Sequence, residues 1–266
     1  MPADEQHVAT LTWAAKAAAG CVCVVALMWL WLLAPRDNPT RPWFALFFLF
    51  SALSAGFGVA LEVSLLWSAG ATDALNYAML ICLELAALGA WTAGSNMLIA
   101  ACTDDSSPPD RHRRYHRSAL AAGCLLCLAA VGAVLGAPAA DRFDAAFVAA
   151  SFGAVGLIAG ALGCAIRRTG STRAAACLIL AGVVATGLGF VASSCIPAST
   201  LPHGVEPDGI FHLSLTVGQL LIFAGVVIYH LADERATAAA QEDCSLQYLP
   251  SGGHSVSLLP APTAGT

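Results

Sequence analysis

Seven long apolar stretches fill most of this 266-residue chain. They cover residues 9–34, 42–68, 73–101, 118–137, 144–166, 174–196 and 209–231. Each reaches the roughly 20 residues that an α-helix needs to cross a bilayer. Charged residues make up 11% of the chain, whereas a soluble domain carries about 25%. The sequence therefore predicts an all-α protein, a seven-transmembrane helical bundle, embedded in a membrane as a multi-pass protein.

The connections between the stretches are short and leave no room for a separate soluble domain. We expect one transmembrane domain over residues 1–232 and a disordered cytoplasmic tail over residues 233–266, which are polar and then rich in Pro, Gly and Ser. Arginines gather in the first, third and fifth connections, and the positive-inside rule places such loops in the cytoplasm. The N-terminus is then outside and the C-terminus inside. The arginines concerned are Arg36, Arg41, Arg111, Arg113, Arg114, Arg117, Arg167, Arg168 and Arg173.

Ionisable side chains inside such stretches are costly and are candidates for function. We single out four of them: Lys16, Glu62, Glu84 and His212. At a rise of about 1.5 Å per residue, Lys16, Glu62 and His212 lie within about 10 Å of the expected outer ends of their helices. Glu84 lies deeper, roughly 18 Å from the outer end of its helix. Three of the four residues are therefore expected to meet near the outer leaflet.

Polar companions extend this candidate site. Asn76 lies in the outer part of the third stretch, and His212, Thr216 and Gln219 recur at i, i+4 and i+7 on one face of the seventh. Lipid cannot satisfy such faces, so we expect them to turn inward. The predicted outer-leaflet pocket, built from the first, second, third and seventh stretches, comprises Lys16, Glu62, Asn76, Glu84, His212 and Gln219.

The cluster has a structural and a functional interpretation. In the first, Lys16 pairs with Glu62 and the polar network fixes the register of the helices. In the second, Glu62 and His212 belong to a ligand, metal or proton site. Zinc is the metal to consider, with His212 and Glu62 as weak candidate ligands, but catalytic zinc normally takes three protein ligands. A charged Lys16 would also repel a metal, so the sequence assigns no cofactor.

A stripe of glycines runs along the fifth stretch. Gly153, Gly156, Gly160 and Gly163 share one helix face, which lets another helix approach closely. We expect helix packing here rather than a ligand cleft, and self-association of the chain through the same stripe is a further prediction. Glycines of the sixth stretch are expected to face it; these are Gly182, Gly187 and Gly189. Membrane lipids are the expected partners, and nothing resembles a nucleic-acid surface.

Short segments of the chain resemble the seven-helix superfamily that contains alkaline ceramidases and progestin/adiponectin receptors, and most closely its uncharacterised members. The segment IFHLSLTVGQLLIFAGV (Ile210–Val226) is similar to the last helix of that group, in which a histidine opens the helix and a glycine closes it. TLTWAAKAA and WFALFFLFSALSAGFGVALE are similar to the first two helices. The resemblance covers about a third of the chain and implies a seven-helix fold.

Members of that superfamily with hydrolase activity hold zinc with three histidines, so the resemblance can be read residue by residue. His212 fits a ligand position, whereas Glu62 stands where a histidine would end the second helix. Thr216 stands where ceramidases have a second histidine, and Trp13 stands where an acidic residue would follow Leu11 and Thr12. The resemblance therefore implies a member that binds its ligand without cleaving it.

Three functions follow as expectations. The first is a non-enzymatic membrane protein that binds a lipid or amphiphile in the outer-leaflet pocket. The alternatives are a metal-dependent lipid amide hydrolase and a small-solute transporter; buried charges favour the latter, and the lack of an internal repeat disfavours it. Enzymatic and non-enzymatic interpretations both stay open from sequence alone.

Overall fold

The computed structural model describes residues 3–36, 38–64, 69–103, 109–138, 141–197, 201 and 207–247, and these form seven α-helices joined by short connections. In chain order the helices are α1 (Ala3–Leu32), α2 (Arg41–Ser64), α3 (Ala69–Cys102), α4 (Pro109–Gly136), α5 (Arg142–Arg167), α6 (Gly170–Cys195) and α7 (Pro207–Gln247). All seven are long and apolar enough to cross a membrane. The all-α, seven-helix prediction is confirmed; the orientation of the two ends stays a prediction.

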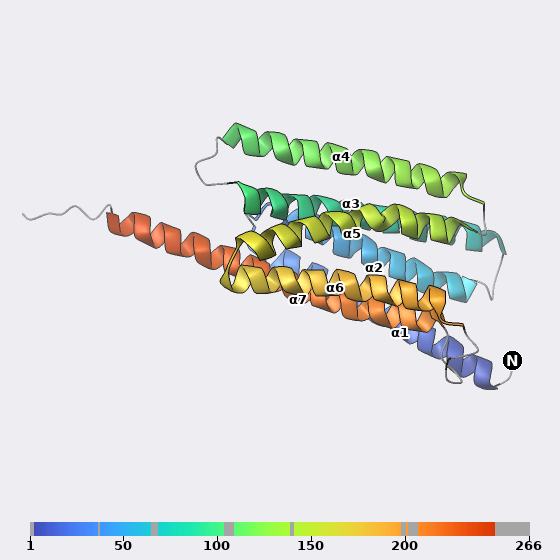
Figure 1. Ribbon diagram of the computed structural model, residues 1–266. Helices are drawn as coiled ribbons and strands as arrows, with labels where there is room; N and C mark the ends of the chain where they lie inside the picture. The colour runs from blue at the N-terminus through green and yellow to red at the C-terminus, as the bar shows by residue number, and fades with distance from the viewer. Residues whose placement is uncertain are drawn as a thin grey trace, which may run out of the picture.

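Six of the helices close a ring. α1 packs on α2, α2 on α3, α3 on α5, α5 on α6, α6 on α7, and α7 returns to α1. α4 lies outside this ring, where it packs against α3 and α5, and Figure 1 shows it as the outermost helix of the bundle. The largest buried cluster draws residues from all six ring helices. Most of the core is therefore shared by the ring, and α4 is an addition to its rim.

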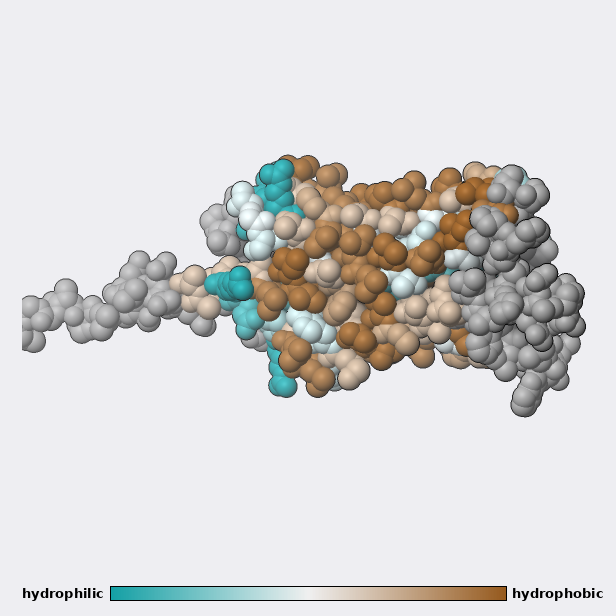
Figure 2. Space-filling model, turned by 90° about the horizontal axis from the view of Figure 1, so that it is seen from below, coloured by the Kyte–Doolittle hydropathy of each residue, from teal (hydrophilic) through white to brown (hydrophobic). Residues whose placement is uncertain are grey.

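The outer surface of the bundle is mostly apolar. Large apolar side chains are exposed on every helix, as expected of a surface that contacts lipid tails. On the face shown in Figure 2, hydrophobic residues form a broad band and hydrophilic residues gather at the end from which α7 projects. We call this the arginine-rich end, because it carries Arg36, Arg41, Arg113, Arg114, Arg117, Arg167, Arg168 and Arg173. The end that carries the N-terminus and the start of α7 is called the opposite end.

The glycine stripe of α5 packs against α3. A Cβ added to Gly153 would lie 2.6 Å from the Cα of Ala87, and one added to Gly156 would lie 2.5 Å from the Cα of Trp91. Only glycine allows backbones to approach this closely. Helix packing by the stripe is therefore confirmed. Self-association through it stays a prediction, and it would have to compete with α3 for the same face.

The glycines of α6 do not face α5, so this expectation was wrong. Gly182 and Gly189 pack against α7, at Gly218 and Ser214, and a Cβ at Gly187 would meet nothing within 4 Å. A face of small residues fits any helix that presents backbone to it, and here α7 occupies that face. Close backbone approach at glycine thus occurs between α3 and α5, between α6 and α7, and, at Gly89, between α2 and α3.

α4 and α7 extend furthest beyond their apolar stretches. α7 continues to Gln247, past the boundary predicted at residue 232, because the segment DERATAAAQED is rich in strong helix formers and free of Gly and Pro. Residues 233–247, expected to belong to a disordered tail, are helical here, and residues 248–266 lie outside the described part. α4 begins at Pro109 rather than near residue 118, since charged residues continue a helix readily once it has left the bilayer.

A polar network holds the connection between α1 and α2 at the arginine-rich end. The side-chain amide of Asn38 donates to Asp233 of α7 at 2.9 Å, and its oxygen accepts from Thr40 at 2.6 Å. The side-chain amide of Asn96 on α3 donates to the carbonyl of Pro39 at 3.3 Å. The other side-chain atom of Asn96, Oδ1, lies 2.6 Å from Nδ1 of His116 on α4. The network joins four segments of the chain, and it fixes the ring at this end.

Candidate functional site

The first turn of α7 places two ionisable side chains at the opposite end. Pro207 stands at the start of the helix, a position that suits proline, because the first N–H of a helix has no partner within it. Asp208 follows in the first turn, where the helix dipole favours a negative charge. His212 lies one turn further on, and its Nε2 is 3.5 Å from Asp208 Oδ2. The sequence spacing of four residues is what brings the two side chains onto one face.

α1 contributes the third member. The amine of Lys16 lies 3.5 Å from the same Asp208 oxygen. The hydroxyl of Thr216 donates to the carbonyl of Ala15 at 3.3 Å, which ties α7 to α1 next to this lysine. The side chains of Lys16 and His212 are 16% and 14% exposed, whereas that of Asp208 is 50% exposed. In this Lys16–Asp208–His212 cluster, Asp208 is therefore accessible from outside, whereas Lys16 and His212 are largely covered.

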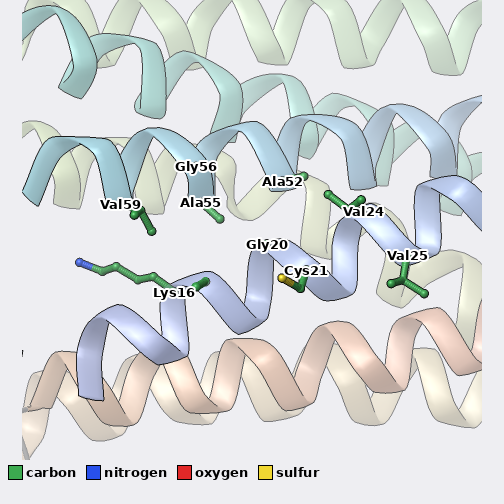
Figure 3. Close-up of a pocket in the computed structure, with 10 residues that line it drawn as sticks. Lys16, Gly20, Cys21, Val24, Val25, Ala52, Ala55, Gly56 and Val59 are labelled. Carbon is green, nitrogen blue, oxygen red and sulfur yellow. The ribbon is translucent and has the colours of Figure 1, made fainter. Parts of the chain in front are cut away.

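An apolar groove begins at the same lysine and runs between α1 and α2 (Figure 3). Its volume is about 440 Å³, which lies within the usual range of ligand sites, about 300–1,000 Å³. In Figure 3, Lys16 and Val59 lie at one end, and Val24 and Val25 lie at the other. The groove is lined by Lys16, Ala17, Gly20, Cys21, Val24, Val25, Ala52, Ala55, Gly56 and Val59.

The structure joins two of the six predicted site residues, Lys16 and His212, through Asp208. Glu62 belongs to α2, but its side chain lies outside the described residues. Asn76 and Glu84 lie on α3, which packs against α2, α4 and α5 rather than in the α1–α7 cluster. Asn76 is half-buried, and Glu84 is fully buried between helices.

Gln219 lies two turns along α7 from His212 and is 5% exposed. Its side-chain oxygen has no hydrogen-bond partner among the described residues. The predicted helix face of His212, Thr216 and Gln219 does turn into the protein, because the first two are half-buried and the third is buried. Gln219 nevertheless lies deeper in the bundle than the cluster.

Sequence reasoning missed two residues. The apolar pattern places Asp208 in the preceding loop, because the seventh stretch begins at residue 209, although Pro207 and the spacing to His212 indicate a helix start. His230 lies within the seventh stretch but is not one of the four ionisable residues singled out above. It is fully buried, with the rings of Trp29 and Phe44 centred 6.2 and 6.3 Å away, and neither ring nitrogen has a partner among the described residues.

The described side chains around His212 do not form a zinc site. Among the described residues, no three His, Cys, Asp or Glu side chains lie close enough together to hold a metal ion. His212 and Asp208 supply two candidate ligands, but the Asp208 oxygen near His212 also contacts the Lys16 ammonium. A cation placed there would face that positive charge at close range. The described residues therefore supply too few ligands for a metal-dependent hydrolytic step.

Comparisons with known proteins found no match: no family model, no curated protein and no solved structure is similar to this chain. The fold and the site geometry are thus the basis for any functional conclusion. What they establish is the class of protein, a seven-helix bundle with membrane-spanning character.

Proposed function

We propose that this membrane protein binds a phospholipid in the groove between α1 and α2, with the lipid headgroup at the Lys16–Asp208–His212 cluster. The observation that carries the proposal is the position of Lys16, which both lines the apolar groove and belongs to the charged cluster. A phospholipid likewise consists of apolar chains joined to a charged headgroup. One residue therefore connects the two halves of a complementary site.

The length of the groove suits one leaflet. From Lys16 to Val25 the groove follows α1 for about 13 Å, at a rise of about 1.5 Å per residue. Half of the hydrocarbon core is about 15 Å thick. An acyl chain lying in the groove would therefore extend from the membrane surface to near the midplane, as it does in the bilayer itself.

The charges at the mouth suit a headgroup that contains phosphate. Lys16 supplies an ammonium, a compact positive charge with three hydrogen-bond donors. Asp208 supplies the opposite charge within 3.5 Å of it, so a dipolar headgroup with phosphate and amine fits better than a purely anionic one. The half-exposed Asp208 and the nearby His212 leave this mouth open to exchange of lipid.

The groove offers a clean test, because Gly56 lines it and a Cβ added there would meet nothing within 4 Å. Gly56→Leu therefore fills the groove without disturbing the packing of the helices. The protein is reconstituted with a phosphatidylethanolamine that carries a photoreactive diazirine in its acyl chain, and cross-linked residues are mapped by mass spectrometry. We expect cross-links on α1 and α2 in the wild type and a several-fold loss in Gly56→Leu.

The matched control is Gly132→Leu on the exposed face of α4, where a Cβ also meets nothing within 4 Å. This variant adds the same side chain to the surface but leaves the groove open, so its cross-linking should equal that of the wild type. Lys16→Met should keep the chain contact and reduce the preference for phospholipid over an uncharged diacylglycerol probe. Equal cross-linking of α1 and α2 in Gly56→Leu and Gly132→Leu would refute the proposal.

The other two functions considered from the sequence have less support. A metal-dependent lipid amide hydrolase requires a third metal ligand beside His212 and Asp208, and the described residues offer none. A small-solute transporter requires a route for a polar solute, and the groove between α1 and α2 and a second groove beside Trp91 are lined mainly by apolar side chains. A lipid-binding site needs an apolar groove with a charged mouth, and the α1–α2 groove with the Lys16–Asp208–His212 cluster provides both.

A further inference from the structure

Glu84 is an acid in the middle of the bundle that the proposed lipid site does not use. It lies about 18 Å along α3 from one end of the membrane-spanning segment Thr72–Cys102 and about 27 Å from the other. Its exposure is 0%, and neither carboxyl oxygen has a hydrogen-bond partner among the described residues. A carboxyl group in this setting is rare and is seldom kept without a role.

The surroundings of Glu84 are apolar. One turn before it, Leu80 packs with Val134 of α4 and Ala146 of α5. One turn after it, Ala87 packs with Cys127 of α4 and with other apolar side chains of α4 and α5. The thiol of Cys127 donates to the backbone carbonyl of Glu84 at 3.6 Å, so α4 lies directly over this part of α3.

Among the residues that the structure describes, the helices around Glu84 bring no counter-ion to it. Residues 118–136 of α4, 145–163 of α5 and 42–61 of α2 contain no Asp, Glu, Lys, Arg or His. The titratable groups that α4 presents on this stretch are the thiols of Cys124 and Cys127. An ionised carboxylate without a partner in such a medium costs several kcal/mol, and far more than a neutral carboxylic acid.

We infer that Glu84 is a proton-binding site at the centre of the membrane, sealed between α3, α4 and α5. The proton is the ligand that this site fits, because a neutral carboxylic acid satisfies the apolar pocket and an anion does not. Access requires α4 to move, and α4 is the one described helix outside the ring, packed mainly on α3 and α5 (Figure 1). Loss of the proton should therefore loosen the contact between α3 and α4.

Dicyclohexylcarbodiimide tests the inference on the wild-type protein, because this apolar reagent reacts with protonated carboxyl groups inside membranes and reaches Glu84 during transient openings of α4. The carboxyl proton moves to one nitrogen of the reagent and a carboxyl oxygen bonds its central carbon; the acyl group then migrates to nitrogen. The resulting N-acylurea retains every atom of both reactants. Mass spectrometry of the α3 peptide should show the adduct on Glu84 at neutral pH and its near-complete loss under alkaline conditions.

Two variants identify the reacting carboxyl and control for folding. Glu84→Gln keeps the size of the side chain and should remove the α3 adduct, whereas Glu62→Gln in α2 should leave it unchanged. A water-soluble carbodiimide, which does not enter the hydrocarbon, should leave Glu84 unmodified in the wild type. Infrared spectroscopy gives an independent readout, since a protonated carboxyl shows a C=O stretching band that Glu84→Gln should lack.

Opening of α4 can be followed at Cys127, which is 6% exposed. We expect alkaline conditions to raise the rate at which a maleimide modifies Cys127 in the wild type, and Glu84→Gln to abolish this increase. Cys124, which is exposed, serves as the internal reference. An α3 peptide without adduct at neutral pH, an adduct that persists under alkaline conditions, or a wild-type infrared spectrum without the band would each overturn the inference.

Discussion

The contact between α3 and α5 makes a quantitative prediction about Gly153→Ala. A Cβ added at this position would lie 2.6 Å from the Cα and 2.7 Å from the carbonyl oxygen of Ala87. Ordinary van der Waals contact begins near 3.4 Å, so the Cα must retreat by about 3.4 − 2.6 = 0.8 Å. The obstructing atoms belong to the backbone of a packed helix, and a rotamer change cannot move them. The whole α3–α5 crossing has to shift.

The size of the effect follows from two opposing contributions. Overpacking of this kind costs about 1–3 kcal/mol. Alanine is also the better helix former, which stabilises the variant by about 0.8–1 kcal/mol. Gly187→Ala on α6 provides the matched control, because the propensity gain is the same and its Cβ would meet nothing within 4 Å. The difference between the two variants therefore isolates the packing cost, about 1–3 kcal/mol in the free energy of unfolding.

Thermal unfolding of the detergent-solubilised protein, followed by fluorescence-detected size exclusion, measures this difference. We expect Gly153→Ala to unfold several degrees below Gly187→Ala, and Gly187→Ala to unfold at or slightly above the wild-type temperature. If Gly153→Ala were as stable as Gly187→Ala, α3 and α5 would not cross at these residues. The assignment of the glycine stripe to an internal helix contact would then be wrong.

Three further variants test other contacts. Asp208→Asn removes the ion pair with Lys16, and because the Asp208 side chain is 50% exposed we expect a loss of at most about 1 kcal/mol, measured by a double-mutant cycle with Lys16→Met. Trp91→Phe removes the 2.9 Å hydrogen bond from the indole to the carbonyl of Ala119 on α4 and should raise hydrogen exchange in α4. His230→Phe replaces two unpartnered buried nitrogens among aromatic rings, so the unfolding temperature should rise rather than fall.

The sequence by itself determined the number of helices and their membrane-spanning character. Those properties depend on the length and polarity of each stretch against the thickness of a bilayer, and each can be read without knowing what lies beside it. It also predicted that the Gly153 stripe is a packing face. It could not say that α3 rather than α6 fills that face, because glycine leaves space for any neighbouring backbone and selects none.

The candidate site also combines residues that the sequence indicates with contacts that only the structure reveals. Lys16 and His212 stood out in the sequence because ionisable side chains are rare in apolar stretches. Only the tertiary structure decided that they meet at Asp208, which belongs to a helix start that the apolar pattern did not include. It also decided that Glu84, which its position in the third stretch already placed deeper, lies beneath α4. Which side chains meet depends on the order and rotation of the helices, and these are set by packing between segments far apart in the chain.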